Sequence, residues 1–279
     1  MMGEDVTKEF SSKDLTAKYK GLLDILRGCE SLAVAFSGGV DSTLLLYAAR
    51  EALGSKAVAI TATPSYVPGR ERREAAAFCR EHGIEQIILD VDGLSIPGFR
   101  DNPPDRCYIC KKALFTEMLR AAEERGIAHL AEGSNLDDMG DYRPGLKALA
   151  ELEIMSPLKA AGMTKADIRA ISRELGLPTA DKPSYACLAS RFAYGETITE
   201  EKLAMVEAAE DYLIGLGFRQ VRVRIHGEDL ARIEVTPEEM AQAFYLKNDI
   251  TAELRRTGFR YVTLDLAGYR TGSMNEALK

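Results

Sequence analysis

The stretch Ser-Gly-Gly-Val-Asp-Ser-Thr, residues 37–43, decides the fold of this 279-residue chain. It follows a short apolar run, residues 31–36, and precedes residues 41–53, whose apolar side chains recur with helical spacing. The pattern predicts a strand, a tight glycine turn and a helix. Backbone N–H groups at the start of such a helix carry partial positive charge, so we expect an anion to bind there.

The residue types of this loop favour phosphate as the anion. The glycines allow a sharp bend and a close approach to an oxyanion, the hydroxyls donate hydrogen bonds, and Asp41 is expected to orient a Mg²⁺ ion or the loop itself. The loop lacks the Gly-Lys-Ser/Thr of P-loop hydrolases and the GxGxxG of dinucleotide folds. A ligand-free turn capped by Asp41 is the alternative. The candidate phosphate-binding residues are Ser37, Gly38, Gly39, Asp41, Ser42 and Thr43.

Apolar strands alternate with helices after this loop. The alternation predicts an α/β fold, a parallel sheet with helices on both faces, whose ligands bind at the carboxyl ends of the strands. Thr61 lies at such an end, and Gly133 and Asn135 lie in the loop after the fourth strand, although a solvated acidic loop is the alternative there. The predicted strands are 57–61, 86–90 and 128–132, and the predicted helices are 69–82, 111–125 and 165–175.

The pattern changes at Gly195. A helix, two strands joined by a short turn, a second helix and a last strand predict a smaller α+β domain. Because a chain of this length is expected to hold about two domains, we place them at residues 1–194 and 195–279. The predicted elements of the second domain are helix 200–213, strands 220–225 and 230–235, helix 237–255 and strand 261–264.

Charge and composition exclude several classes of protein. The net charge of −7 divides into −3 before Gly195 and −4 from there onward, so neither part resembles a basic nucleic-acid-binding surface. The apolar runs are strand-sized and the first residues do not read as a signal peptide. We therefore expect a cytoplasmic protein that acts on a small anionic molecule, without nucleic acid or membrane.

Three of the five cysteines are candidates for chemistry. Cys29 and Cys79 have apolar neighbours and are expected to be buried thiols. Cys107 and Cys110 form a CxxC pair at a predicted helix start, where the helix end and nearby basic residues favour the thiolate, and Cys187 lies in a loop. A zinc site would need a fourth ligand, and no histidine lies close in sequence to these cysteines. Three thiolates could instead hold a 4Fe-4S cluster.

Two arginines alternate with apolar residues in the strand Val-Arg-Val-Arg-Ile, residues 221–225. Period-two alternation puts Arg222 and Arg224 on one face, where they could bind phosphate or carboxylate. The alternative is a solvated strand face balanced by Glu228 and Asp229.

Residues 37–42 resemble the SGGxDS loop of the ATP-pyrophosphatase (PP-loop) superfamily, which has an adenine nucleotide α-hydrolase-like fold. Residues 181–191, with their Cys-Leu-Ala-Ser-Arg segment, resemble the LarE family of that superfamily more specifically. Residues 142–145, 156–158 and 268–275 carry the same resemblance, which spans about residues 32–275.

The resemblance implies an ATP-dependent sulfur transferase of nickel-pincer nucleotide biosynthesis. With Mg²⁺, ATP would adenylate a carboxylate of pyridinium-3,5-biscarboxylate mononucleotide, and sulfur would then replace the adenylate. Where the family has one cysteine at the position of Cys187, that residue surrenders its sulfur and becomes dehydroalanine. Members with all three cysteines are associated with a 4Fe-4S cluster, which we favour here for Cys107, Cys110 and Cys187 over sacrifice or a persulfide relay.

The resemblance also implies further binding residues and an assembly. It adds Ser190, Arg191 and Arg270 to the candidates for binding nucleotide or substrate, and it implies a homo-oligomer, in the family a hexamer. Three competing hypotheses remain. The protein could be a tRNA thiolase, which would need a basic RNA-binding domain, or an ATP-dependent amide synthetase, which would need an ammonia source. It could also be a nucleotide-binding regulatory module without catalysis.

Overall fold

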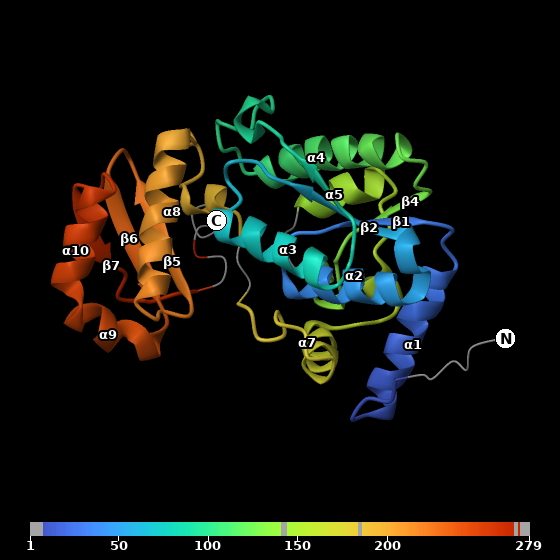
Figure 1. Ribbon diagram of the computed structural model, residues 1–279. Helices are drawn as coiled ribbons and strands as arrows, with labels where there is room; N and C mark the ends of the chain where they lie inside the picture. Colours follow the sequence, from blue (N-terminus) through green and yellow to red (C-terminus); the bar gives the residue numbers. More distant parts are fainter. Residues whose placement is uncertain (1–7, 141–143, 184–185, 271–272, 274–279) are drawn as a thin grey trace. The chain divides into compact units, whose positions relative to one another are not determined.

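The computed structural model describes residues 8–140, 144–183, 186–270 and 273, which form two compact units (Figure 1). The first unit contains the described residues up to 63 together with 69–91 and 111–183. The second contains 64–68, 92–110 and the described residues from 186 onward. The predicted domain boundary between residues 194 and 195 stays a prediction. Across the described residues, no helix is both long enough and apolar enough to span a membrane.

The first unit is built on a parallel sheet of four strands, in the order β3-β2-β1-β4. Leu32 in β1 pairs with Ala57 in β2 and with His129 in β4, so the central strand has neighbours on both sides. The strands are β1 (Leu32–Ala35), β2 (Ala57–Ala62), β3 (Gln86–Leu89) and β4 (His129–Ala131). The parallel sheet predicted from the alternating pattern is confirmed.

Helices cover both faces of this sheet because β1 and β2 carry consecutive apolar residues, which make both faces apolar. Leu32 and Val34 pack with the helices α1, α2, α3 and α7 in one core cluster. Ala33 lies in a second cluster with residues of α4 and α5, on the opposite face of the strand. The helices are α1 (Lys13–Arg27), α2 (Val40–Leu53), α3 (Gly69–Glu81), α4 (Arg106–Glu123), α5 (Pro144–Glu151), α6 (Pro157–Ala160) and α7 (Lys165–Glu174).

The second unit contains a three-stranded sheet in the order β5-β6-β7. β5 and β6 form the predicted antiparallel hairpin, whose turn contains Gly227 at a φ of 60°, and β7 joins β6 in parallel. The elements are α8 (Glu200–Gly215), β5 (Val221–His226), β6 (Leu230–Val235), α9 (Met240–Tyr245), α10 (Lys247–Arg256) and β7 (Tyr261–Leu264).

Two predicted helices differ from the structure. The expected helix 237–255 is a short 3-10 turn, Pro237–Glu239, followed by α9 and α10, and the break falls at Leu246, whose ψ of 9° leaves the helical range. The helix expected from residue 111 begins earlier, at Arg106, soon after the proline pair at 103–104. Cys107 and Cys110 therefore lie inside the first turns of α4. The helices α1, α5 and α6 were not predicted.

Candidate functional site

The glycine loop has the geometry expected for anion binding. Gly38 adopts a φ of 71°, and a β-carbon added there would lie 3.3 Å from that of Ala75 in α3. Gly39, the residue before α2, has an extended backbone conformation and no side chain that could cap the helix. The first N–H groups of α2 are consequently not capped by the residue before them, which leaves the positive end of the helix for an anion.

The hydroxyls of the loop are arranged around this helix start. The Ser37 and Ser42 Oγ atoms are 3.1 Å apart, and Ser42 also donates to the carbonyl of Gly39 at 3.2 Å. Thr43 is fully buried, and among the described residues its Oγ1 has no hydrogen-bond partner. These side chains are therefore brought together, as the sequence predicted, while their binding of phosphate stays a prediction.

The loop after β4 packs directly on the start of α2. A β-carbon on Gly133 would lie 3.0 Å from the Ser42 backbone nitrogen, so glycine is what permits this approach. Asn135 donates from Nδ2 to an Asp41 carboxylate oxygen at 3.3 Å, and the Lys165 ammonium binds the other oxygen. Asp41 is thus already paired, and a Mg²⁺ ion held by it would share the carboxylate with Lys165.

Thr61 links the ends of two strands. It is buried, and its hydroxyl donates to the Phe36 carbonyl at 2.9 Å and accepts from the Gln86 side chain at 2.9 Å. The hydroxyl therefore has a structural use, and contact of this residue with a ligand stays a prediction.

The three candidate cysteines gather around one tyrosine of the second unit. The hydroxyl of Tyr66 is 3.0 Å from the Cys110 sulfur. Burial raises the pKa of Tyr66 far above its usual value, and the nearby thiols of Cys110, Cys187 and Cys107 raise it further. Tyr66 accordingly stays protonated and is able to donate a hydrogen bond to sulfur. Sequence reasoning missed this residue because its only signal is an unremarkable Pro-Ser-Tyr segment.

The position of Tyr66 is fixed by close packing. A β-carbon on Gly93 would lie 2.2 Å from Cε1 of Tyr66, so only glycine fits beneath the ring. The rings of Tyr66 and Phe99 pack against each other at a centroid distance of 4.6 Å, tilted by 33°. The backbone carbonyl of Tyr66 accepts from the Leu188 N–H at 2.9 Å, which ties the tyrosine to the residue directly after Cys187.

A buried asparagine joins the segments that carry the cysteines. Asn102 is fully buried, has a φ of 50° and donates from its side chain to the carbonyl of Ala193 at 2.6 Å. Its side-chain oxygen accepts from Arg106, the first residue of α4. The start of the CxxC helix and the chain just after the Cys187 loop are therefore held together, although they are distant in sequence.

The chemistry of the three thiols fits an iron–sulfur cluster, but their arrangement is not a finished metal site. Cys107 is exposed, Cys110 and Cys187 are half-buried, and none of the three is in a disulfide. Among the described residues, no three histidine, cysteine or acidic side chains are grouped closely enough to hold a metal ion.

The remaining two cysteines are buried, as predicted. Cys29 and Cys79 are 6% and 1% exposed. Burial raises the pKa of Cys79 to about 11 and also raises that of Cys29, so both thiols stay protonated and unreactive.

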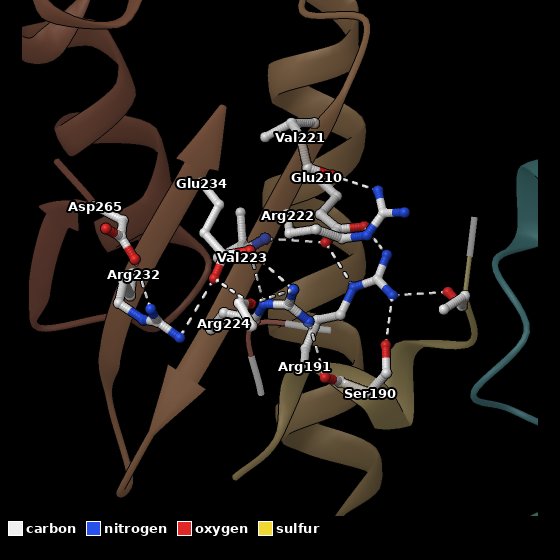
Figure 2. Close-up of polar contacts among 12 residues, drawn as sticks. Ser190, Arg191, Glu210, Val221, Arg222, Val223, Arg224, Arg232, Glu234 and Asp265 are labelled. Carbon is white, nitrogen blue, oxygen red and sulfur yellow. Dashed lines mark hydrogen bonds and ion pairs between the residues drawn. The ribbon is translucent and has the colours of Figure 1, made fainter. Parts of the chain in front are cut away.

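A network of buried arginines binds the backbone of the Cys187 loop (Figure 2). Arg191 is fully buried and pairs with both carboxylate oxygens of Glu210, at 2.8 and 2.7 Å. It also donates to the carbonyls of Ala186 and Cys187 and to the Ser190 hydroxyl. Arg191 thereby fixes the backbone that carries Cys187, and its predicted contact with nucleotide or substrate stays a prediction.

The two strand arginines are buried as well. Arg224 pairs with Glu234 at 2.8 Å and donates to the Ser190 carbonyl (Figure 2). Arg222 lies over the Tyr269 ring at 5.3 Å, and burial together with the charge of Arg191 lowers its pKa to about 10. The alternative of a solvated face was wrong, because these arginines are 3% and 5% exposed.

The charges named in that alternative have other partners. Glu228 pairs with Lys202, and Asp229 pairs with Arg260. Arg270 is exposed. Burial acts to raise the pKa of Asp265, but the Ala267 N–H, Arg232 and, last, the charge of Arg270 outweigh it and lower that pKa. Residues of the resemblance that lie outside the described part are Tyr142, Arg143, Ser184, Tyr185, Thr271, Gly272, Met274 and Asn275.

Comparison with known proteins gives the family. A scan against protein-family models finds no match. The chain is 42% identical to an uncharacterized protein of Synechocystis sp. over 95% of its length and 99% of that protein's. It is 41% identical to the pyridinium-3,5-bisthiocarboxylic acid mononucleotide synthase of Lactiplantibacillus plantarum, over 95% of this chain and 96% of the synthase. The chain belongs to the LarE family.

A more distant relative connects LarE to the wider superfamily. The tRNA-specific 2-thiouridylase of Azorhizobium caulinodans is 30% identical over 54% of this chain and 48% of that enzyme. The family and its distant relationship to PP-loop enzymes, which use ATP, confirm the coarser part of the resemblance seen in the sequence.

The packing under Tyr66 predicts a sharp difference between two glycines. In this LarE chain, Gly93→Ala is expected to lower the free energy of unfolding by about 1–3 kcal/mol, because its β-carbon overlaps the tyrosine ring. Gly21→Ala in α1 is the control: nothing lies within 4 Å of its β-carbon, so stability should rise by about 0.5–1 kcal/mol. Urea unfolding measures both, and equal stability of the two variants would contradict the packing.

The arginine network predicts a second difference. Arg191→Met leaves the Glu210 carboxylate buried without its cation and should lower the free energy of unfolding by about 3–5 kcal/mol. Arg173→Met breaks an exposed pair with Asp181 and should leave the free energy of unfolding nearly unchanged. A loss below about 1 kcal/mol in Arg191→Met would show that the buried pair does not support the loop.

Proposed function

We propose that the protein is an ATP-dependent sulfur transferase that makes a thiocarboxylate on pyridinium-3,5-biscarboxylate mononucleotide. The observation that carries the proposal is the contact of Tyr66 with the Cys110 sulfur and with Leu188, next to Cys187, in a chain whose helix α2 begins at a glycine without a side-chain cap. The full-length match to a bisthiocarboxylic acid mononucleotide synthase supports this substrate class. The nickel-pincer nucleotide would be the end product of the pathway.

The first half of the proposed reaction is activation of the carboxylate. A substrate oxygen attacks the α-phosphorus of ATP, an oxygen–phosphorus bond forms, and the bond to pyrophosphate breaks. The glycine loop and the start of α2 would hold the phosphates, with Mg²⁺ neutralising their charge. In this half the protein positions the reactants and stabilises charge, and it supplies no side-chain nucleophile.

The second half is sulfur transfer. A sulfur nucleophile attacks the carbonyl carbon of the adenylate and AMP leaves, so that a carbon–sulfur bond replaces the carbon–oxygen bond. Tyr66 would donate a hydrogen bond to the Cys110 sulfur, and Arg191 would hold the Cys187 backbone in place. Arg222, Arg224 and Arg270 remain the proposed contacts for substrate phosphate or carboxylate.

The origin of the sulfur divides this proposal into two versions. We favour a 4Fe-4S cluster on Cys107, Cys110 and Cys187, which would supply a sulfide that is not part of the polypeptide. The other version consumes Cys187 itself. The expected homo-oligomer and the cytoplasmic location accompany both versions as predictions.

A substrate assay tests the function. Purified protein with ATP, Mg²⁺ and the biscarboxylate mononucleotide should release pyrophosphate and yield first an adenylate and then a thiocarboxylate, both followed by mass spectrometry. Pyrophosphate release that depends on tRNA or on ammonia would point to a thiolase or an amide synthetase. No pyrophosphate release with any of these substrates would leave only a binding module.

The cluster version predicts a specific role for Cys107. Anaerobic reconstitution with iron and sulfide should give the broad visible absorption of an iron–sulfur cluster, and Cys107→Ala should lose it, whereas Cys29→Ala should keep it because Cys29 is buried elsewhere. If both proteins stay colourless with full single-turnover activity, the cluster version fails. Loss of one H₂S from the mass of the Cys187 peptide after turnover would then support sacrifice.

A further inference from the structure

A lysine outside the glycine loop binds the loop backbone. Lys182 follows α7, and its ammonium donates to the Gly38 carbonyl at 2.9 Å and to Glu74 of α3 at 2.6 Å. All three residues belong to the first unit. The ammonium therefore lies at the glycine whose positive φ shapes the loop.

The backbone of Lys182 is held firmly by α7. Arg169 donates to the carbonyls of Ala180 and Lys182, at 2.6 and 2.8 Å. The Lys182 side chain is only 13% exposed, whereas that of Glu74 is 55% exposed. The lysine is thus fixed at its base and its ammonium is sheltered, but its carboxylate partner is largely in solvent.

The glycine loop itself contains no cationic side chain that could bind a polyphosphate. Residues 37–43 contain an aspartate but no lysine or arginine, and Lys165 already balances the charge of Asp41. A polyphosphate at the helix start brings several negative charges that helix N–H groups neutralise only in part. Lys182 is bonded to the loop itself, and an ammonium has three donors, one more than its two contacts here use.

We propose that Lys182 binds the β- and γ-phosphates of ATP, which leave as pyrophosphate, and that Glu74 is its partner only while the site is empty. The inference rests on the proposed function. The Gly38 carbonyl keeps the ammonium docked at the loop, and phosphate oxygens replace the exposed carboxylate, whose hold on the lysine is weak because water screens it. A compact ammonium is able to exchange partners in this way without moving its backbone.

This role predicts opposite effects for the two partners. Lys182→Ala should weaken binding of inorganic pyrophosphate and of α,β-methylene-ATP by about tenfold or more, with less than about a twofold effect on AMP. Glu74→Gln should tighten pyrophosphate binding by about twofold to fivefold, because the ammonium no longer has to leave a carboxylate. In the double variant the effect of Glu74→Gln should disappear.

Isothermal titration calorimetry of the full chain measures these affinities without any sulfur transfer. Lys8→Ala and Glu51→Gln, which break another lysine–glutamate pair of the same unit, are the matched controls and should leave them unchanged. If Lys182→Ala does not fold, Glu74→Gln keeps the lysine and decides the matter by itself.

The outcomes separate this inference from the proposed function. Three results would each overturn the phosphate role: an unchanged pyrophosphate affinity in Lys182→Ala, an equal loss of AMP affinity in that variant, or an unchanged pyrophosphate affinity in Glu74→Gln. Lys182 would then only stabilise the loop. Wild-type protein that binds neither pyrophosphate nor α,β-methylene-ATP would reject the proposed function itself.

Discussion

The turn at Gly38 requires a backbone conformation that other residues rarely adopt, and the first unit is organised around it. With a φ of 71°, this residue lets β1 pass directly into α2, so that the first N–H groups of the helix lie at the carboxyl edge of the sheet. Gly133 packs against the same helix start, and Lys182 binds the Gly38 carbonyl. Several segments thus meet at one short loop, whose own side chains supply only hydroxyls and one carboxylate.

The second unit joins the segment that carries the CxxC pair to the loop that carries Cys187. Asn102 joins the start of α4 to the chain after the Cys187 loop, and Tyr66 contacts Cys110 by its hydroxyl and Leu188 by its carbonyl. Because burial and the thiols raise the pKa of Tyr66, its proton is retained beside the Cys110 sulfur. In the proposed reaction, activation of the carboxylate and supply of the sulfur would therefore depend on separate sets of contacts, one in each unit.

The sequence predicts the parts of this protein that depend on local pattern. The strand–turn–helix at residues 31–53 is visible because apolar spacing and glycine act over a few residues, and the same holds for the parallel sheet and the hairpin. The alternation at 221–225 predicts that two arginines share a face, but not that the face is buried, because Glu210 and Glu234 approach from other elements. Tyr66 and Lys182 were missed for the same reason, since their importance arises only from contacts made in the folded chain.

The buried arginines have a meaning that their charge alone does not give. Burying an ion pair usually adds little stability compared with apolar packing, because desolvation offsets the attraction, so such pairs are better explained by the geometry they impose. Arg191 binds Glu210 with one edge of its guanidinium and uses the rest to satisfy the carbonyls of Ala186 and Cys187. An apolar side chain of equal volume would fill the space and leave both carbonyls without this donor. The pair therefore orders the backbone of the Cys187 loop while the thiol itself stays half-exposed, as the proposed sulfur transfer would require.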